Sequence, residues 1–266
     1  MDELQALGGP AGFAITYVAL VVIIALRYFA IAGLFHWLLW SREGPRVKTR
    51  RLTDGRPRPA TVRAEIGWSL ISALIYALPG VIVIEAWKDG GTLLYTDWRP
   101  IDWIWIPVSI FICLFVQDTW FYWTHRLMHH PRLFRIVHLV HHRSRPPSPF
   151  AAFSFHPYES LVYAWLLPLL VFIIPIHVAA VLFILTLMTI ASVLNHSGQE
   201  ILPDRWLKGP IGHHLITAAH HDIHHRDFTK NFALYFRFWD KVMATDVMEE
   251  VYPFLETGRQ QREGAD

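Results

Sequence analysis

The sequence predicts an all-α integral membrane protein: about three transmembrane helices plus a helical hairpin, with a cytoplasmic histidine-rich helical cap that holds a two-metal site. Three observations lead to this prediction. The 266-residue chain is 53% hydrophobic, above the roughly 45–50% that is typical of soluble domains. Its apolar residues fall in long blocks with few charges, which is the pattern of membrane spans. Three clusters of histidines lie between and after these blocks.

The first three blocks predict three membrane-spanning helices. Residues 13–40 form an apolar block interrupted only by Arg27 and His36, and at about 1.5 Å per residue it exceeds the roughly 30 Å of bilayer hydrocarbon. The acidic N-terminus lacks the basic region of a cleavable signal peptide, so we expect this block to be a permanent anchor. The second block covers residues 66–87, with a kink expected at Pro79-Gly80. The third, residues 101–123, ends next to the first histidine cluster.

The charge of the first loop predicts the orientation. Residues 41–63 hold eight Arg or Lys against two acidic residues. Cytoplasmic loops carry such an excess of positive charge, so we expect this loop in the cytoplasm and the N-terminus outside. Two further crossings then return the chain to the cytoplasmic side at His125. The later histidine clusters follow on the same face.

The next apolar block predicts a helical hairpin. Residues 161–194 are too long for one ordinary span, they contain Pro168 and Pro175, and histidine clusters lie on both sides. If these clusters are to meet, the chain must enter the membrane and come back. We therefore expect two arms, 161–173 and 177–194, bent near Pro175.

The net charge and the cysteine content argue against a nucleic-acid-binding protein and against a disulfide-stabilised fold. The net charge is only +2, so no nucleic-acid partner is predicted. Cys113 is the single cysteine and can form no intrachain disulfide.

The spacing of the histidines predicts a metal site. Within each cluster the intervals are three or four residues, so on a helix the imidazoles share one face and can point to one place. Neutral imidazole is a common ligand of iron, copper and zinc. Eight cluster histidines are too many for one ion, so we expect two metal ions. These histidines are His125, His129, His138, His141, His142, His221, His224 and His225.

Two single histidines flank the hairpin on the side of the clusters. His196, in "NHSGQE", is delivered back toward the clusters by the second arm and is expected to join the ligands. For His156, in "SFHPYE", a ligand role and a structural role stay open. His36 and His177 lie in apolar blocks without clustered partners, so we expect them to serve packing or to lie at the membrane interface.

Four carboxylates are candidates to orient the ligand imidazoles. Asp118 lies seven residues before His125 on the same helix face, where it could fix the tautomer of an imidazole. Glu159 and Asp222 lie close to histidines in the sequence. Glu200, four residues after His196, is either an orienting partner or a ligand itself. The alternative for each of the four is a solvated charge at the membrane interface.

Two metals held mostly by neutral nitrogens at a membrane edge suit O₂ activation, and the apolar spans suit a long hydrocarbon substrate. Two other functions remain open. A zinc-dependent hydrolase would need a carboxylate base, for which Asp222, Glu159 or Glu200 could serve. A metal-binding or transport protein would need ligands within the spans. The aromatic segment 231–246 is expected either to cap the site or to lie at the interface as an amphipathic helix.

Three motifs in this order, "HRLMH", "HLVHH" and "HDIHH", resemble the histidine boxes of the fatty acid hydroxylase/sterol desaturase superfamily. The segments "DTWFYWTHRLMHH", "FHPYE", "NHSG" and "NFALYFRFWDKVMATD" are similar to the flanking motifs of that superfamily. The resemblance covers roughly residues 105–247, whereas the first hundred residues match only as a pair of spans.

The resemblance implies a membrane-bound, non-haem di-iron monooxygenase. Its reaction would hydroxylate or desaturate a C–H bond of a membrane lipid, sterol or isoprenoid such as a carotenoid, and of the two we favour hydroxylation. It also implies three parts: residues 1–100 as spans and basic loop, 101–250 as the catalytic domain and 251–266 as a polar tail. The cofactors implied are two Fe ions and O₂, with Zn able to replace Fe in preparations. No cytochrome b5-like domain is visible, so electrons are expected from a separate electron-transfer protein.

In the resemblance, the eight cluster histidines are the metal ligands, and His196 and His156 would complete the set. One position departs from the pattern. Some members carry a further histidine four residues after the "HSG" histidine, and this chain has Glu200 there.

Overall fold

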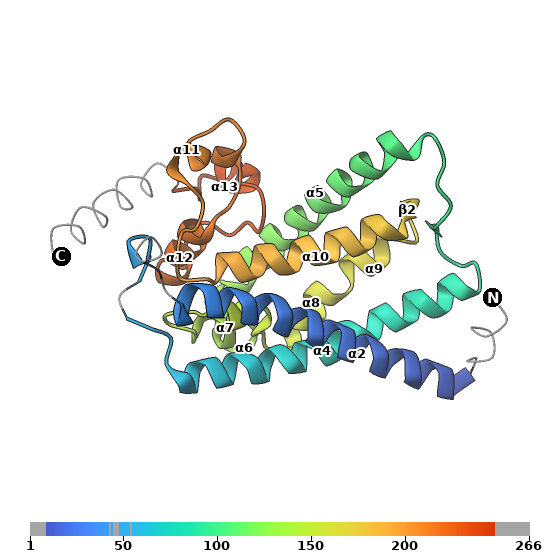
Figure 1. Ribbon diagram of the computed structural model, residues 1–266, viewed down its shortest axis with the longest axis horizontal. Helices are drawn as coiled ribbons and strands as arrows, with labels where there is room; N and C mark the ends of the chain where they lie inside the picture. Colours follow the sequence, from blue (N-terminus) through green and yellow to red (C-terminus); the bar gives the residue numbers. More distant parts are fainter. Residues whose placement is uncertain (1–8, 43, 45–47, 54, 248–266) are drawn as a thin grey trace.

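Four long helices dominate the structure, a computed structural model that describes residues 9–42, 44, 48–53 and 55–247. They are α2 (Gly9–His36), α4 (Pro59–Lys88), α5 (Asp102–Met128) and α10 (Val178–Asn195) (Figure 1). A π-helical turn, Trp37–Ser41, continues α2. In the described part of the chain, these four helices are long and apolar enough to cross a membrane. Three spans and the return arm of a hairpin are thereby confirmed.

The surface of the long helices is apolar. On α2, the side chains of Ile15, Val18, Val22 and Leu26 are exposed at intervals of three or four residues, and so they share a face. A soluble protein would bury such a stripe. A lipid-facing helix exposes it to hydrocarbon, as expected for an integral membrane protein.

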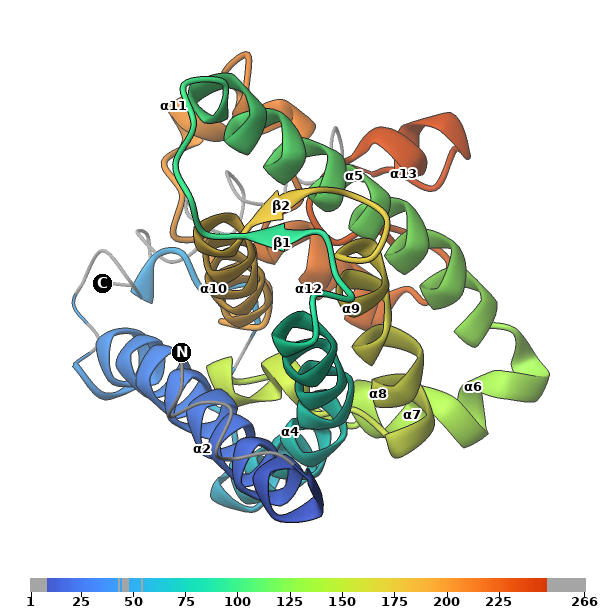
Figure 2. The same ribbon diagram turned by 90° about the vertical axis from the view of Figure 1, so that its right-hand side faces the viewer.

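The predicted hairpin is present, but its two arms differ. The first arm is broken into α8 (Pro157–Ala164) and α9 (Leu166–Leu170), and the second is the continuous α10. The bend contains β2 (Ile176–His177), which pairs in parallel with β1 (Leu94–Tyr95) (Figure 2). This short sheet ties the bend to the loop between α4 and α5, and His177 Nε2 lies 3.0 Å from the carbonyl oxygen of Thr96. The expected structural role of His177 is met.

Short helices gather where α5 and α10 end and form a cap over that end of the long helices (Figure 1). They are α6 (Pro131–Val137), α7 (Leu139–His142), α11 (Asp204–Leu207), α12 (Ala218–Arg226) and α13 (Phe238–Val242), with 3-10 turns at Pro149–Phe153 and Gly212–His214. The basic loop reaches the same end, because Arg51 pairs with Gln199 in an isolated antiparallel bridge. Segments far apart in the sequence therefore meet in the cap.

Two helix boundaries differ from the hydropathy pattern. The helix α4 begins at Pro59, seven residues before the apolar block, and continues through Pro79 without interruption. The helix α5 extends past residue 123 to Met128 and carries His125 in its last turn. Hydropathy marks only the part of a helix that lies in hydrocarbon, whereas the backbone hydrogen bonds continue into the polar cap.

Candidate metal centre

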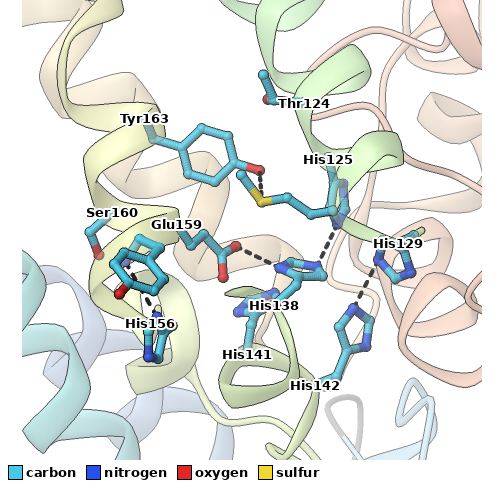
Figure 3. A network of polar contacts seen from close by, with 12 residues as sticks. Thr124, His125, His129, His138, His141, His142, His156, Glu159, Ser160 and Tyr163 are labelled. Atoms are coloured by element: carbon cyan, nitrogen blue, oxygen red, sulfur yellow. Dashed lines mark hydrogen bonds and ion pairs between the residues drawn. The ribbon is translucent and has the colours of Figure 1, made fainter. Parts of the chain in front are cut away.

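Nine histidines form two groups within the cap. In each group the candidate ligand nitrogens all lie within 4.8 Å of one another. The first group contains His125, His129, His138, His142 and His224, and the second contains His141, His196, His221 and His225. The labelled residues of the first group converge on one place in Figure 3. All nine had been expected as ligands from the sequence.

The spacing had suggested that all histidines of one cluster point to the same place. In the structure, two of the three clusters divide their histidines between the two groups. On α7, the neighbours His141 and His142 point to different groups. On α12, His224 belongs to the first group, while His221 and His225 belong to the second. Successive helical positions are rotated by about 100°, so one short helix can face two sites. The two groups are therefore joined through α7 and α12.

Fixed acceptors set the tautomers of four imidazoles. Nδ1 of His125 donates to the carbonyl oxygen of Phe232, and Nδ1 of His224 donates to that of Lys230, each over 2.7 Å. Nδ1 of His196 donates to the carbonyl oxygen of Ser192 over 2.7 Å. A neutral imidazole carries one proton, so a donating Nδ1 leaves Nε2 with a lone pair. The Nε2 atoms are thus prepared as ligands.

The fourth fixed acceptor is a buried carboxylate. Nδ1 of His138 lies 2.7 Å from Oε1 of Glu159, as Figure 3 shows. Glu159 is fully buried, which raises its pKa well above the ordinary value. The Oε2 atom of Glu159 has no hydrogen-bond partner. The expectation that Glu159 orients a histidine agrees with this contact, although the histidine is His138 and not the neighbouring His156.

Imidazole nitrogens approach one another in both groups. The Nε2 atoms of His125 and His138 are 2.9 Å apart, and that of His196 is 3.1 Å from His141 and 2.8 Å from His221. Nδ1 of His125 donates to a carbonyl oxygen. When Glu159 is ionised and accepts from Nδ1 of His138, the two Nε2 lone pairs face each other, and this is repulsive unless a cation lies between them. The donor set therefore fits a metal ion in the first group, and the second group brings four nitrogens within 4.8 Å of one another, which also fits a metal ion.

Burial keeps these histidines neutral. It lowers the pKa of His129 to about 2 and that of His196 to about 4. The pKa values of the other grouped histidines outside the spans lie well below the ordinary value, because the imidazoles are desolvated and close to one another. Only a neutral imidazole binds a metal ion, so the site keeps its ligands in the form that binds.

The segment after α12 closes the site. Oδ1 of Asp118 accepts hydrogen bonds from the backbone N–H groups of Leu234, Tyr235 and Phe236 at 2.7–3.3 Å. The spacing of Asp118 from the first cluster had suggested that it binds an imidazole. It binds the backbone instead. Of the two roles considered for residues 231–246, covering the site agrees with these contacts.

A second carboxylate also binds the backbone of this segment, and the sequence had not indicated it as a site residue. Asp240, in α13, accepts from the backbone N–H groups of Phe232 and Ala233 at 2.9 and 3.0 Å. The carbonyl oxygen of Phe232 is the acceptor that orients His125. Asp240 lies in "FWDKV", and nothing in its spacing links it to a histidine cluster.

Three other residues expected at the site bind partners other than the grouped imidazoles. His156 caps α8, where its Nδ1 accepts from the backbone N–H of Tyr158, and it is in neither histidine group (Figure 3). Glu200 accepts from the backbone N–H of Ala219 on α12 and contacts no imidazole. Asp222 forms an ion pair with Arg226 over 2.7 Å.

A large apolar cavity lies beside the metal groups. A pocket of about 20 Å³ directly at the histidines is lined by His125, His138, His141, His196 and His221. A cavity of about 440 Å³ extends between the long helices. Four residues line both spaces: Phe121, Phe155, Ser192 and Leu234. The small pocket has room for one or two non-hydrogen atoms. The large cavity has room for a lipid-sized molecule.

Comparison with known proteins places these motifs in a family. A family model described as fatty acid hydroxylase matches residues 110–245. The chain is 32% identical to the Delta(7)-sterol 5(6)-desaturase ERG3B of Gibberella zeae, over 65% of this chain and 53% of that protein. It is 31% identical to methylsterol monooxygenase 1 of Rattus norvegicus, over 61% of this chain and 57% of that protein. It is 33% identical to the Delta(7)-sterol 5(6)-desaturase erg3C of Aspergillus fumigatus, over 73% of this chain and 66% of that protein.

The chain thus spans between about half and two thirds of the length of these relatives. No solved structure matches it. The family model covers the helices that carry all nine grouped histidines. The chain belongs to the fatty acid hydroxylase family.

Proposed function

We propose that this protein is a membrane-bound oxidoreductase that oxidises a C–H bond of a lipid, with a sterol or isoprenoid as further candidates. One observation carries the proposal: two groups of neutral, oriented imidazoles lie directly beside an apolar cavity of about 440 Å³. The relatives named as sterol desaturases and a methylsterol monooxygenase support it. We assign the catalytic domain to residues 101–250, between the spans of residues 1–100 and the tail of residues 251–266.

The metal pair is proposed to be iron, with the five-histidine and the four-histidine group as ligands. Bound iron would supply O₂ activation, which side chains alone cannot perform. Hydroxylation consumes R–H, O₂, two electrons and two protons, and yields R–OH and one water. Desaturation uses the same inputs, removes two hydrogens and yields two waters. Either reaction requires electrons from a separate electron-transfer protein.

The residues of the chain position the reactants. Glu159 and the carbonyl oxygens of Phe232, Lys230 and Ser192 hold the ligand imidazoles in one tautomer. Phe121 lies at the boundary between the pocket and the cavity and would place the hydrocarbon beside the metals. Because this boundary is apolar, water is kept away from the reacting carbon.

The site geometry favours this function over a hydrolase. A hydrolase needs a carboxylate that is free to activate water. Glu200 binds the backbone of α12 and Asp222 pairs with Arg226, while Glu159 already orients His138 through Oε1 and keeps only Oε2 unpaired. These were the three carboxylates that could have served as a base.

The membrane orientation is also a proposal. The basic loop preceding α4 and the histidine cap lie at the same end of the long helices (Figure 1). If the positive-inside rule places this loop in the cytoplasm, the metal site faces the cytoplasm and the N-terminus lies outside. A soluble cytoplasmic electron donor would then have access to the cap.

The test begins with the metal content of protein purified from iron-replete cells, followed by reductant-dependent O₂ uptake with and without lipid extract. We expect about two irons per chain, as two histidine groups require, and uptake stimulated by lipid. The matched variants are His224→Ala, in the first group, and His214→Ala, at an exposed histidine outside both groups. Lipid-stimulated uptake that survives His224→Ala, or zinc-only protein that stays inert after iron loading, would overturn the proposal.

A further inference from the structure

A charged side chain lies in the wall of the large cavity. Arg27 on α2 lines the 440 Å³ space, and it is the single charged residue among those that line it. The cavity is otherwise built mainly from aliphatic and aromatic side chains of all four long helices. A cation in such surroundings is costly, and it is retained in membrane proteins mainly for function.

Arg27 cannot reach water along its helix. The span Gly9–Ser41 places Arg27 about 27 Å from its first residue and about 21 Å from its last, at 1.5 Å per residue. Arginines near helix ends extend their heads to the interface, but the three methylene groups of the side chain are far shorter than either distance. The guanidinium of Arg27 therefore stays within the depth of the membrane.

The guanidinium is not neutralised by the protein. Nε of Arg27 is buried and has no hydrogen-bond partner. Among the described residues, no carboxylate forms an ion pair with it. Two of the polar side chains that share the cavity are bonded elsewhere: Gln117 accepts from Tyr235, and Ser192 donates to the carbonyl oxygen of Ala152. Arg27 thus keeps its hydrogen-bonding capacity for a molecule inside the cavity.

We propose that Arg27 binds the polar end of the substrate, and that this end carries a carboxylate. A guanidinium binds a carboxylate with two parallel hydrogen bonds and an opposite charge. A neutral hydroxyl, such as that of a sterol, would leave the charge of Arg27 uncompensated within the depth of the membrane. The substrate class is therefore an acid-terminated lipid. This assignment rests on the proposed function, because it names the head of the same substrate.

The shape of the cavity agrees with a long-chain acid. Along α10 the lining runs from Val178 to Ser192, which is about 21 Å of helix. Ser192 and Phe155 also line the histidine pocket. The hydrocarbon chain fills the apolar space, the carboxylate binds Arg27 in the α2 wall, and the distance between Arg27 and the histidines selects the carbon that lies beside the metals.

The test measures binding without turnover. Purified iron-loaded protein in detergent micelles, without reductant, is incubated at pH 8 with radiolabelled octadecanoate, and unlabelled octadecanoate, octadecan-1-ol and octadecane compete for it. We expect octadecanoate to bind at least about tenfold more tightly than the alcohol, since a charged hydrogen-bond pair is lost with the alcohol. Arg27→Gln removes this preference. Arg42→Gln, which removes an exposed charge just beyond the same span, keeps it.

Folding is checked on the same samples. Arg27→Gln removes a cation without an ion-pair partner from the depth of the membrane, so its melting temperature without ligand is expected to equal or exceed that of the parent protein. Octadecanoate should raise the melting temperature of the parent protein and of Arg27→Lys, but not that of Arg27→Gln. Equal binding of acid and alcohol by the parent protein, or an acid preference that survives Arg27→Gln, would overturn the assignment. The binding test involves no turnover, so the two proposals can fail separately. A failure of lipid oxidation would contradict the proposed function, whereas the role of Arg27 is decided by the binding measurement alone.

Discussion

Nδ1 of His138 lies 2.7 Å from Oε1 of Glu159, and both side chains are almost completely buried. The other ring nitrogen of His138 lies 2.9 Å from Nε2 of His125. One carboxylate thus directs the lone pair of a ligand histidine into the first group, from a helix that contributes no residue to either group. This relationship leads to the first prediction.

Replacing Glu159 by leucine is expected to weaken metal binding by about 10–100-fold, because the tautomer of His138 is no longer fixed. Glutamine at the same position keeps an oxygen acceptor and should retain most of the affinity. The measurement is iron retention against a series of chelator concentrations. Glu85→Gln, at a partly exposed carboxylate paired with Lys88, is the control. Metal retention by Glu159→Leu equal to that of the parent protein would refute the role.

The division into two groups predicts selective loss of metal. His224→Ala removes a ligand of the first group and His141→Ala a ligand of the second. Each variant should retain about one iron per chain, lose activity and still insert in the membrane, because neither position lies within a span. Iron is counted by elemental analysis and insertion by membrane fractionation. If either variant held two irons, the assignment of that histidine would be wrong.

His156 offers a contrasting prediction. It caps α8 and belongs to neither group, so His156→Ala should keep two irons per chain. Loss of the cap is expected to cost about 1 kcal/mol of stability, which His156→Asn should restore. Iron content and melting temperature are measured together. A drop to one iron in both variants would return His156 to the ligand set.

Asp118 is predicted to act on the site through the backbone. Asp118→Ala leaves three buried or partly buried N–H groups, of Leu234, Tyr235 and Phe236, without their acceptor. Each unpaired group costs about 1–3 kcal/mol, so a large fall in melting temperature and a loss of iron are expected. Asp118→Asn keeps an oxygen acceptor and should be milder. Asp97→Ala, in an exposed loop, serves as the control, and equal stability of Asp118→Ala and this control would contradict the prediction.

Acid is expected to destabilise the metal-free protein. Burial lowers the pKa of His196 to about 4 and that of His220 to about 3, whereas in the unfolded chain histidine titrates near 6.5. Unfolding therefore takes up protons below pH 6.5, and stability falls by up to about 1.4 kcal/mol per pH unit for each such histidine. Burial raises the pKa of Asp222 to about 6 and also raises the pKa values of Glu159, Glu200 and Asp240, which acts in the opposite direction, but more histidines than carboxylates are affected.

Thermal unfolding of metal-free protein between pH 7 and pH 5 checks this. The melting temperature should fall with the pH, while iron-loaded protein should resist the change because its imidazoles are occupied. A melting temperature of the metal-free protein that does not change over this range would show that the histidines are not buried in the neutral form.

Filling the cavity should separate substrate binding from metal binding. Val181 on α10 lines the large cavity, and Val181→Trp is expected to lower lipid-stimulated O₂ uptake at least about tenfold while two irons remain. Ile173→Trp introduces the same side chain at an exposed position outside the cavity lining and is the control. Undiminished uptake by Val181→Trp would mean that the substrate does not enter this space.

The sequence by itself determined the spans, the hairpin and the nine grouped histidines. Long apolar blocks can satisfy their backbone only as helices in hydrocarbon, so residues 13–40 and 66–87 are identified from composition alone. Intervals of three and four residues bring imidazoles to the same side of a helix, which is why "HLVHH" and "HDIHH" indicate ligands before any fold is known.

The tertiary structure alone decided how these parts are used. Spacing could not show that His141 and His142 serve different groups, because that depends on how α7 lies between α5, α10 and α12. Asp118 has the spacing of a histidine partner yet binds the backbone of residues 234–236, since a chain segment 116 or more residues later packs against it. Arg27 appears in the sequence as an interruption of an apolar block, and only packing turns it toward a cavity. Local pattern fixes which face of a helix a residue occupies, but long-range packing fixes what that face meets.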